Sequence, residues 1–144
     1  MSKAKIAVSK FNDGFSCSQA IFSTYCTELG LEQKLGLKIA GAFGGGISYT
    51  GETCGAVTGA IMLIGLKHGR VKADDLNSKE HVKALVNEFL GKFKSRNEYL
   101  KCKELLKFDF SKPKENEIIH NQGLTRILCP KFVNDAAEII ESIL

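Results

Sequence analysis

Seven glycines lie in the segment 41–60, which reads GAFGGGISYTGETCGAVTGA. Every glycine loses more backbone freedom on folding than any other residue, so such a segment limits what the chain can form there. Gly51, Gly55 and Gly59 recur at every fourth position. On a helix this spacing produces a face of small residues that another backbone can approach closely. The glycine run 44–46 predicts a flexible or left-handed connection before that helix.

Glycine-rich segments also occur in nucleotide-binding loops, and that alternative fails on detail. No Lys-Ser/Thr pair follows the glycines, and no strand-then-helix unit carries a GxGxxG pattern. We therefore expect no phosphate loop here. The face of small residues is compatible with close packing inside the protein and equally with a homodimer.

The rest of the chain carries a helical period nearly throughout. Apolar residues at 82, 85, 86, 89 and 90 recur near every 3.6 positions, and no convincing alternating run of strand type appears. We predict one all-α domain over residues 1–144, a helical bundle of five to six helices with a Gly-rich loop. The predicted helices span 4–11, 17–29, 32–43, 52–67 and 78–93 continuing through 97–106, with a loop at 108–123 and a last helix beginning at Pro130.

Composition and charge exclude several functional classes. The chain is 44% hydrophobic and 25% charged, which is typical of a folded water-soluble domain. Its net charge of +4 is spread among acidic residues, and no basic cluster alternates with aromatic rings, so we expect no nucleic-acid partner. The longest apolar run, 54–66, is too short to span a bilayer, and the first ten residues lack a signal-peptide core. These features predict a cytoplasmic protein with no membrane association.

Five cysteines stand at positions 17, 26, 54, 102 and 129. In a reducing compartment they are not expected to form permanent structural disulfides. They are then buried small hydrophobic residues, metal ligands or redox thiols. No CxxC pair occurs, so zinc-ribbon, thioredoxin-type and ferredoxin-type spacings are absent.

The local setting of the cysteines favours reactive thiols. Cys17, Cys54 and Cys129 all lie at or next to predicted helix starts, where free N–H groups and the helix dipole stabilise a thiolate. Cys102 is expected in mid-helix between two lysines, whose charge acts in the same direction. Cys26 follows Cys17 by nine residues and falls on nearly the opposite helix face, so we expect it to pack in the core.

Two motifs connect these cysteines to a known family. Residues 54–59, CGAVTG, match a CGAxxG pattern, and residues 14–20, GFSCSQA, match a G-x-x-C-S/A-Q-A/S start. With Cys102 and the Cys129-Pro130 pair, the chain resembles the redox-active proteins named for their C…GCAxxG…C…C pattern. The resemblance covers nearly the whole chain. It implies that Cys17, Cys54, Cys102 and Cys129 are the four family cysteines, that Cys26 is extra, and that an iron–sulfur cluster or another prosthetic group is bound in some members.

Three hypotheses remain open from the sequence. The four cysteines form one redox site that exchanges thiols and disulfides or transfers electrons with a redox partner of unspecified identity. Alternatively, the same four thiolates bind a metal or an iron–sulfur cluster without catalysis. A third hypothesis is a structural helical protein with buried cysteines. The histidines, His68, His81 and His120, are expected to have surface roles, and Glu52 is expected to cap a helix start.

Overall fold

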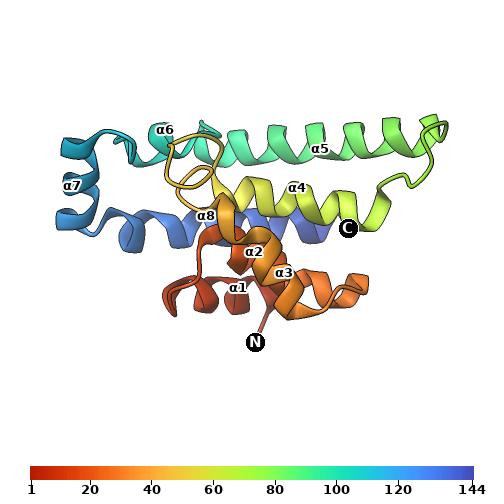
Figure 1. The fold of residues 1–144 in the computed structure, drawn as a ribbon, viewed down its shortest axis with the longest axis horizontal. Coiled ribbons are helices and arrows are strands. Elements are labelled where there is room, and N and C mark those ends of the chain that lie inside the picture. Colours follow the sequence, from red (N-terminus) through yellow and green to blue (C-terminus); the bar gives the residue numbers. More distant parts are fainter.

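The computed structural model describes residues 1–144, and almost the whole chain is helical (Figure 1). No β-strand is present, and one isolated bridge pairs Thr53 with Lys101. None of the helices combines the length and the apolar character that crossing a membrane requires. The prediction of an all-α fold is therefore confirmed. Eight α-helices follow one another: α1 Lys3–Asn12, α2 Cys17–Tyr25, α3 Gln33–Ala40, α4 Gly55–His68, α5 Leu76–Asn97, α6 Cys102–Leu106, α7 Pro113–Gln122 and α8 Leu124–Ile143.

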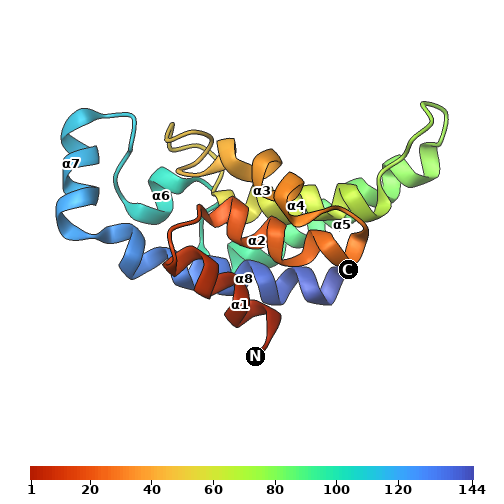
Figure 2. The same cartoon turned by 60° about the horizontal axis from the view of Figure 1, so that its bottom comes forward.

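Helix α4 lies at the centre of the molecule. It is apolar around its whole circumference, and Val57, Leu63 and Ile64 are completely buried. Such a helix must be covered on all sides, and α2, α5 and α8 pack against it. Figures 1 and 2 show α4, α5 and α8 running along the long axis, with α1 to α3 on one side and α7 across one end. Full burial of each large aliphatic side chain stabilises the fold by about 1.5–3 kcal/mol.

The predicted count of five to six helices is too low, for two local reasons. After Asn97 the chain adopts a positive φ of 71° at Glu98, which ends α5, so residues 97–106 do not continue as one helix. Residues 113–122 form α7 where a loop is predicted. Pro113 occupies the first turn of that helix, where its missing N–H costs no hydrogen bond. Pro113 therefore marks the start of a helix, whereas the sequence predicts that it belongs to a loop.

The predicted start of the last helix is also wrong. Helix α8 begins at Leu124, directly after Gly123, whose left-handed conformation ends α7. Pro130 therefore lies inside α8. Proline lacks the N–H that would bond to the carbonyl of Arg126, four residues earlier, and this single loss interrupts the helical hydrogen bonding without ending the helix.

Two further helix starts differ from their predicted positions. Helix α5 begins at Leu76, because the Asp75 side chain accepts a hydrogen bond from the Ser78 N–H at 3.1 Å and caps the helix. Helix α4 begins at Gly55, with Cys54 as its N-cap residue, so residue 52 still belongs to the preceding loop. The predicted helices at 17–29 and 32–43 each end in a short 3-10 helix, Cys26–Leu29 (η1) and Gly41–Phe43 (η2).

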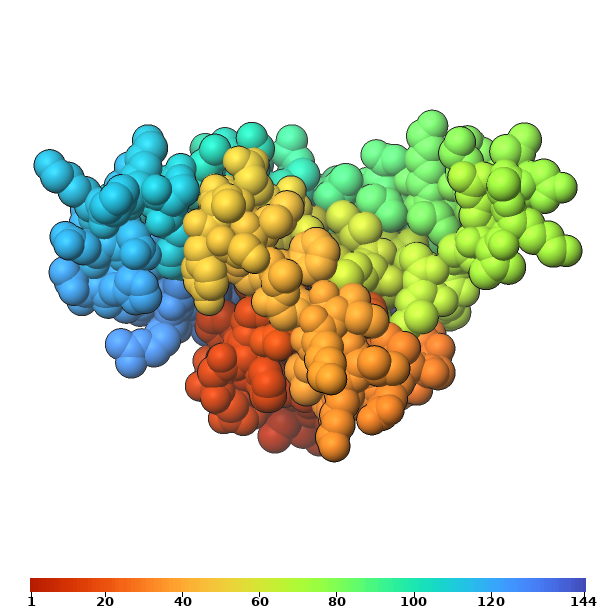
Figure 3. Space-filling view, viewed as in Figure 1, coloured from red at the N-terminus to blue at the C-terminus, as the bar shows by residue number.

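The Gly-rich loop between η2 and α4 contains an unusual run of backbone conformations. Residues 45–49 all have positive φ, and only the first two of them are glycine. For each residue other than glycine this conformation costs about 1–2 kcal/mol. The Ser48 hydroxyl donates to the Ala42 carbonyl at 2.6 Å and the Thr50 hydroxyl to the Gly46 carbonyl at 2.7 Å, which holds the loop in shape. In Figure 3 this loop (yellow) lies on the surface between the N-terminal helices and the α6–α7 region.

Candidate functional site

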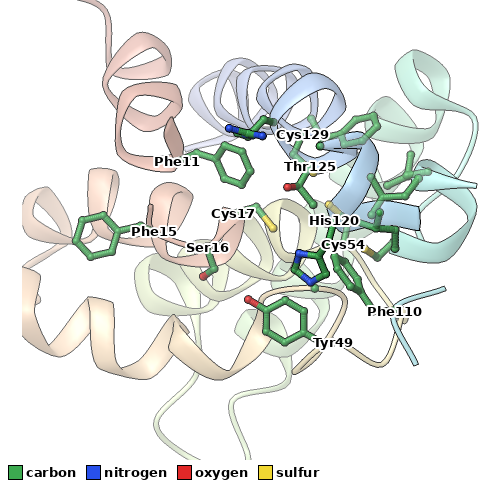
Figure 4. Close-up of a pocket in the computed structure, with 18 of the residues that line it drawn as sticks. Phe11, Phe15, Ser16, Cys17, Tyr49, Cys54, Phe110, His120, Thr125 and Cys129 are labelled. Atoms are coloured by element: carbon green, nitrogen blue, oxygen red, sulfur yellow. The ribbon is translucent and has the colours of Figure 1, made fainter. Parts of the chain in front are cut away.

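A cavity of about 710 Å³ lies where the start of α2, the Gly-rich loop, α6 and the α7–α8 corner meet. Four cysteines line it: Cys17, Cys54, Cys102 and Cys129. Each of the four is at most 9% exposed. Figure 4 shows the Cys17 sulfur pointing into this space, with Tyr49 and His120 among the side chains around it. Half of the remaining lining residues are apolar or aromatic: Phe11, Phe15, Tyr49, Leu105, Leu106, Phe110, Ile119 and Phe132.

Cys17 is the first residue of α2, and the local sequence fixes this start. The Ser16 hydroxyl accepts a hydrogen bond from the Gln19 N–H, and the Gln19 side chain accepts one from the Ser16 N–H. This reciprocal capping box satisfies two N–H groups of the first turn. It holds Cys17 at a helix N-terminus, as the sequence predicted.

The Cys17 sulfur reaches the N-terminus of the neighbouring helix α4. A Cβ atom built on Gly55 would lie 2.6 Å from it, a separation that only glycine at this position avoids. A Cβ atom on Gly59 would lie 3.0 Å from the Ser18 carbonyl oxygen of α2. The close approach predicted for the small-residue face is therefore found at Gly55 and Gly59, and the approaching helix carries Cys17. Gly51 does not belong to the helix and turns the loop with a φ of 74°.

The surroundings of Cys17 lower the pKa of its thiol to about 7. The largest cause is the Cys54 thiol, which acts as a hydrogen-bond donor to the Cys17 sulfur and favours the thiolate. Burial opposes this effect. The backbone N–H groups of Ser18, Gly55 and Ala56 add to the stabilisation of the thiolate. The N-termini of α2 and α4 thus supply their free N–H groups to one sulfur atom.

The other three thiols of the cavity have raised pKa values. Donation to the Cys17 sulfur, followed by burial, raises the pKa of Cys54 well above its ordinary value. Burial and the charge of Cys17 raise the pKa of Cys102 to about 12. The same two causes raise the pKa of Cys129. Near neutral pH Cys17 is therefore the one thiol of the cavity with a substantial thiolate fraction, beside three thiols whose raised pKa values keep them protonated.

A two-residue antiparallel pairing positions Cys54 and Cys102. The Cys54 N–H donates to the Leu100 carbonyl at 2.8 Å, and the Cys102 N–H donates to the Glu52 carbonyl at 2.7 Å. Because side chains alternate along paired strands, Cys54 and Cys102 lie on the same face of this pairing, opposite to Thr53 and Lys101. Glu52 lies 3.8 Å from Lys101 and 3.5 Å from Lys103, so it forms ion pairs across the pairing, whereas a capping role was expected.

The structure reverses the predicted settings of Cys102 and Cys129. Cys102 is the first residue of the short helix α6, where the sequence predicted a mid-helix position. Cys129 lies inside α8 and does not precede a helix start. The error at Cys129 follows from Pro130, which sequence reasoning treats as a first-turn residue and which here lies in a helix interior. Cys26 is completely buried away from the cavity, with its sulfur against Gly36.

Two basic residues of the cavity carry no motif in the sequence. His120, near the end of α7, and Arg126, in the first turn of α8, both line it. The sequence predicts a surface position in a loop for His120 and no role for Arg126, whereas both lie in helices. Pro113 is the sequence feature that could have predicted their position, because a helix that begins there brings His120 to the α7–α8 corner beside Arg126. His68 lies at the end of α4 and packs edge-on against His81, with ring centroids 4.9 Å apart.

The thiols of the cavity are not arranged as ligands of one metal ion. No group of three or more cysteine, histidine, aspartate or glutamate side chains in this structure is placed to hold one metal ion. A single metal ion needs ligands that converge on one point, so this arrangement does not fit a mononuclear metal centre. Binding of an iron–sulfur cluster, whose cysteine ligands bond to different iron atoms, stays a prediction.

Comparison with known proteins gives one match. The model of the family described as "Putative redox-active protein (C_GCAxxG_C_C)" matches residues 15–143. No curated protein and no solved structure matches the chain. The matched region contains all four cysteines of the cavity and nearly every helix that lines it. Because the match extends over most of the sequence, this chain belongs to the C_GCAxxG_C_C family.

Proposed function

We propose that this protein is a thiol-based redox protein in which Cys17 and Cys54 alternate between a dithiol and a disulfide. The observation that carries the proposal is the place of the Cys17 sulfur at the N-terminus of α4, 2.6 Å from a Cβ atom built on Gly55, in the cavity that the N-cap residue Cys54 also lines. The Cys54 thiol is also the largest cause of the lowered pKa of Cys17. Thiolates attack disulfides, and a thiol with a pKa near the ambient pH combines abundance with nucleophilicity. Cys17 meets this condition at neutral pH.

The proposed reaction oxidises the protein and reduces a disulfide, R–S–S–R. The Cys17 thiolate attacks one sulfur of R–S–S–R, forms a mixed disulfide and releases one RS⁻. Cys54 loses its proton to that leaving thiolate, which becomes RSH. The Cys54 thiolate then attacks the Cys17 sulfur, forms the Cys17–Cys54 disulfide and releases a second RS⁻, which takes a proton from water. Two electrons pass from the two cysteines to the disulfide.

Cys102 and Cys129 have a different role in this proposal. Their raised pKa values keep them protonated near neutral pH, so they do not compete with Cys17 as nucleophiles. They line the cavity as small, weakly polar side chains and leave Cys17 as its one negative charge. The first attack is therefore assigned to Cys17 alone.

The proposal is tested by single-turnover exchange between the reduced protein and a small disulfide, followed by mass spectrometry. Cys17→Ser should abolish exchange at the cavity. Cys54→Ser should stop the reaction at the mixed disulfide, so that one R–S group stays bound to Cys17. Cys26→Ser serves as the matched control and should react like the original protein. Rapid exchange in Cys17→Ser would contradict the assignment of the nucleophile.

A further inference from the structure

Apart from the Cys17 thiolate, the charged side chains of the cavity lining are of one sign. Arg126 carries the one permanently charged side chain of the lining, and no aspartate or glutamate lines the cavity. Asp109 is close enough to act on Cys102, yet it does not line the cavity, accepts hydrogen bonds from Ser111 and lies near Lys103 and Lys112. The cavity therefore combines an apolar wall with a positive group.

Arg126 is free to bind a ligand. It makes no salt bridge in the molecule, in contrast to Arg96, which pairs with Asp135 and Glu138. Its guanidinium lies over Gly123, since a Cβ atom on that glycine would be 3.2 Å from an Arg126 nitrogen. The guanidinium offers a planar array of N–H donors that matches a carboxylate. The His120 ring and the Thr125 hydroxyl, which also line the cavity, add further donors.

The size of the cavity limits the kind of substrate. A volume of about 710 Å³ is in the range of small-molecule sites. Cys17 is only 9% exposed and Cys54 only 5%, so a disulfide on the surface of a folded protein cannot reach them without rearrangement. A small molecule can enter the cavity and place its sulfur atoms beside Cys17.

We propose that the substrate is a low-molecular-weight disulfide that carries a carboxylate, bound by Arg126 and His120 while its sulfur faces Cys17. This inference rests on the proposed function and adds the class of substrate to it. The apolar wall contacts the carbon chain of the substrate, and the carboxylate lies at the α7–α8 corner. The exchange follows the steps given above and yields two molecules of a carboxylate-bearing thiol.

The experiment compares three small disulfides of similar size and different charge. Dithiodipropionate is anionic, hydroxyethyl disulfide is neutral and cystamine is cationic. Single-turnover rates with the reduced protein are divided by the rates of the same disulfides with free dithiothreitol, which removes their intrinsic differences in reactivity. The normalised rate should be highest for dithiodipropionate. Arg126→Gln should lower that rate roughly threefold to tenfold and leave hydroxyethyl disulfide unaffected.

Two variants make the comparison specific. Arg126→Lys keeps the positive charge and should recover part of the preference for the anion. Arg70→Gln removes an arginine from the loop between α4 and α5, which does not line the cavity, and should change none of the rates. Binding of dithiodipropionate to Cys17→Ser, measured by calorimetry, should weaken in the Cys17→Ser, Arg126→Gln double variant.

The possible results separate this inference from the proposed function. Equal normalised rates for the three disulfides would overturn the inference and leave the thiol exchange of Cys17 intact. Exchange with a protein disulfide such as that of insulin, without exchange with any small disulfide, would also overturn it. If Cys17 reacts with no disulfide of any kind, the proposed function fails and the inference fails with it.

Discussion

The reactivity assigned to Cys17 depends on atoms from three separate parts of the chain. Its own helix supplies the Ser18 N–H, helix α4 supplies the N–H groups of Gly55 and Ala56, and Cys54 supplies a thiol proton. A thiol with a pKa near 7 is deprotonated in a substantial fraction at neutral pH, whereas an ordinary cysteine is largely protonated. The pKa of this one thiol is thus lowered by groups that lie far from it in the sequence.

Replacing Cys54 should raise the pKa of Cys17. In Cys54→Ala the strongest donor to the thiolate is lost, so the pKa moves from about 7 upward toward the ordinary cysteine value of about 8.5. The measurement is the pH dependence of alkylation of the reduced protein by iodoacetamide, with the site identified by mass spectrometry. Cys26→Ala, which removes a buried thiol outside the cavity, should leave the midpoint unchanged. A midpoint that stays near 7 in Cys54→Ala would show that the thiol of Cys54 does not stabilise the thiolate.

At the scale of the elements, the contact between α2 and α4 places Cys17 and Cys54 in the same cavity. This contact depends on glycine at the N-terminus of α4, because a side chain at Gly55 would meet the Cys17 sulfur at 2.6 Å and the Ser18 nitrogen at 3.0 Å. Gly65, ten residues further along the same helix, has no atom within 4 Å of a Cβ built on it. Helix α4 therefore contains one glycine that close packing requires, Gly55, and one that it does not require, Gly65.

This difference predicts opposite effects of two identical substitutions. Gly55→Ala should lower the free energy of unfolding by about 1–3 kcal/mol, because it forces overpacking between the two helices. Gly65→Ala should raise it by up to about 1 kcal/mol, because alanine has a higher helix propensity. Urea unfolding of both variants under reducing conditions measures the two changes. Gly55→Ala as stable as the original protein would mean that α2 and α4 approach less closely than described.

Several helices could be predicted from the sequence. The helix boundaries that were predicted wrongly share one cause, which is that tertiary packing determines them. The start of α2 was predictable because Ser16 and Gln19 form a local capping box. The end of α5 was not, since Glu98 adopts a positive φ that no local residue type announces. Pro113 and Pro130 are the same amino acid in opposite settings, one opening α7 and one inside α8. Tertiary packing determines whether a proline begins a helix or lies inside one, and local sequence propensity cannot distinguish the two cases.

The candidate site could be predicted only in part, because local sequence signals mark some of its residues and tertiary packing brings in the others. Cys17 and Cys54 carry local signals, a capping residue and a glycine-rich helix start. Cys129 reaches the cavity from the interior of α8, for which no local signal exists. Arg126 and His120 depend on the corner between α7 and α8, a tertiary feature. Sequence motifs thus identify the thiols, whereas the side chains proposed to select the substrate become visible only in the fold.

At the scale of the whole molecule, the buried thiols link stability to pH. Cys17 has a lowered pKa of about 7, so its contribution to stability is present above the unfolded value of about 8.5 and is lost as the pH falls through 7. Cys102 has a raised pKa of about 12, so its contribution is present below about 8.5 and is lost as the pH rises toward 12. Cys54 and Cys129, also with raised pKa values, act in the same direction as Cys102.

These opposite signs predict that the thiols favour the folded state most strongly near pH 8.5. Each thiol changes the free energy of unfolding by at most about 1.4 kcal/mol per pH unit. Urea unfolding of the reduced protein across the neutral and alkaline range measures the dependence. Cys102→Ser should make the loss of stability at alkaline pH less steep, and Cys17→Ser should flatten the change around pH 7. An unchanged alkaline slope in Cys102→Ser would contradict the raised pKa of that thiol.

Cys17 and Cys54 are proposed to form the redox-active disulfide of this protein. The most direct measurement is peptide mapping by mass spectrometry after the reduced protein reacts with one equivalent of a small disulfide. Trypsin separates the two residues, because Lys34 and Lys38 lie between them. We predict a crosslink between the peptides that contain Cys17 and Cys54, lost on reduction with dithiothreitol and regained on reoxidation. A crosslink that pairs Cys54 with Cys102, or Cys102 with Cys129, while Cys17 remains a free thiol, would contradict the account.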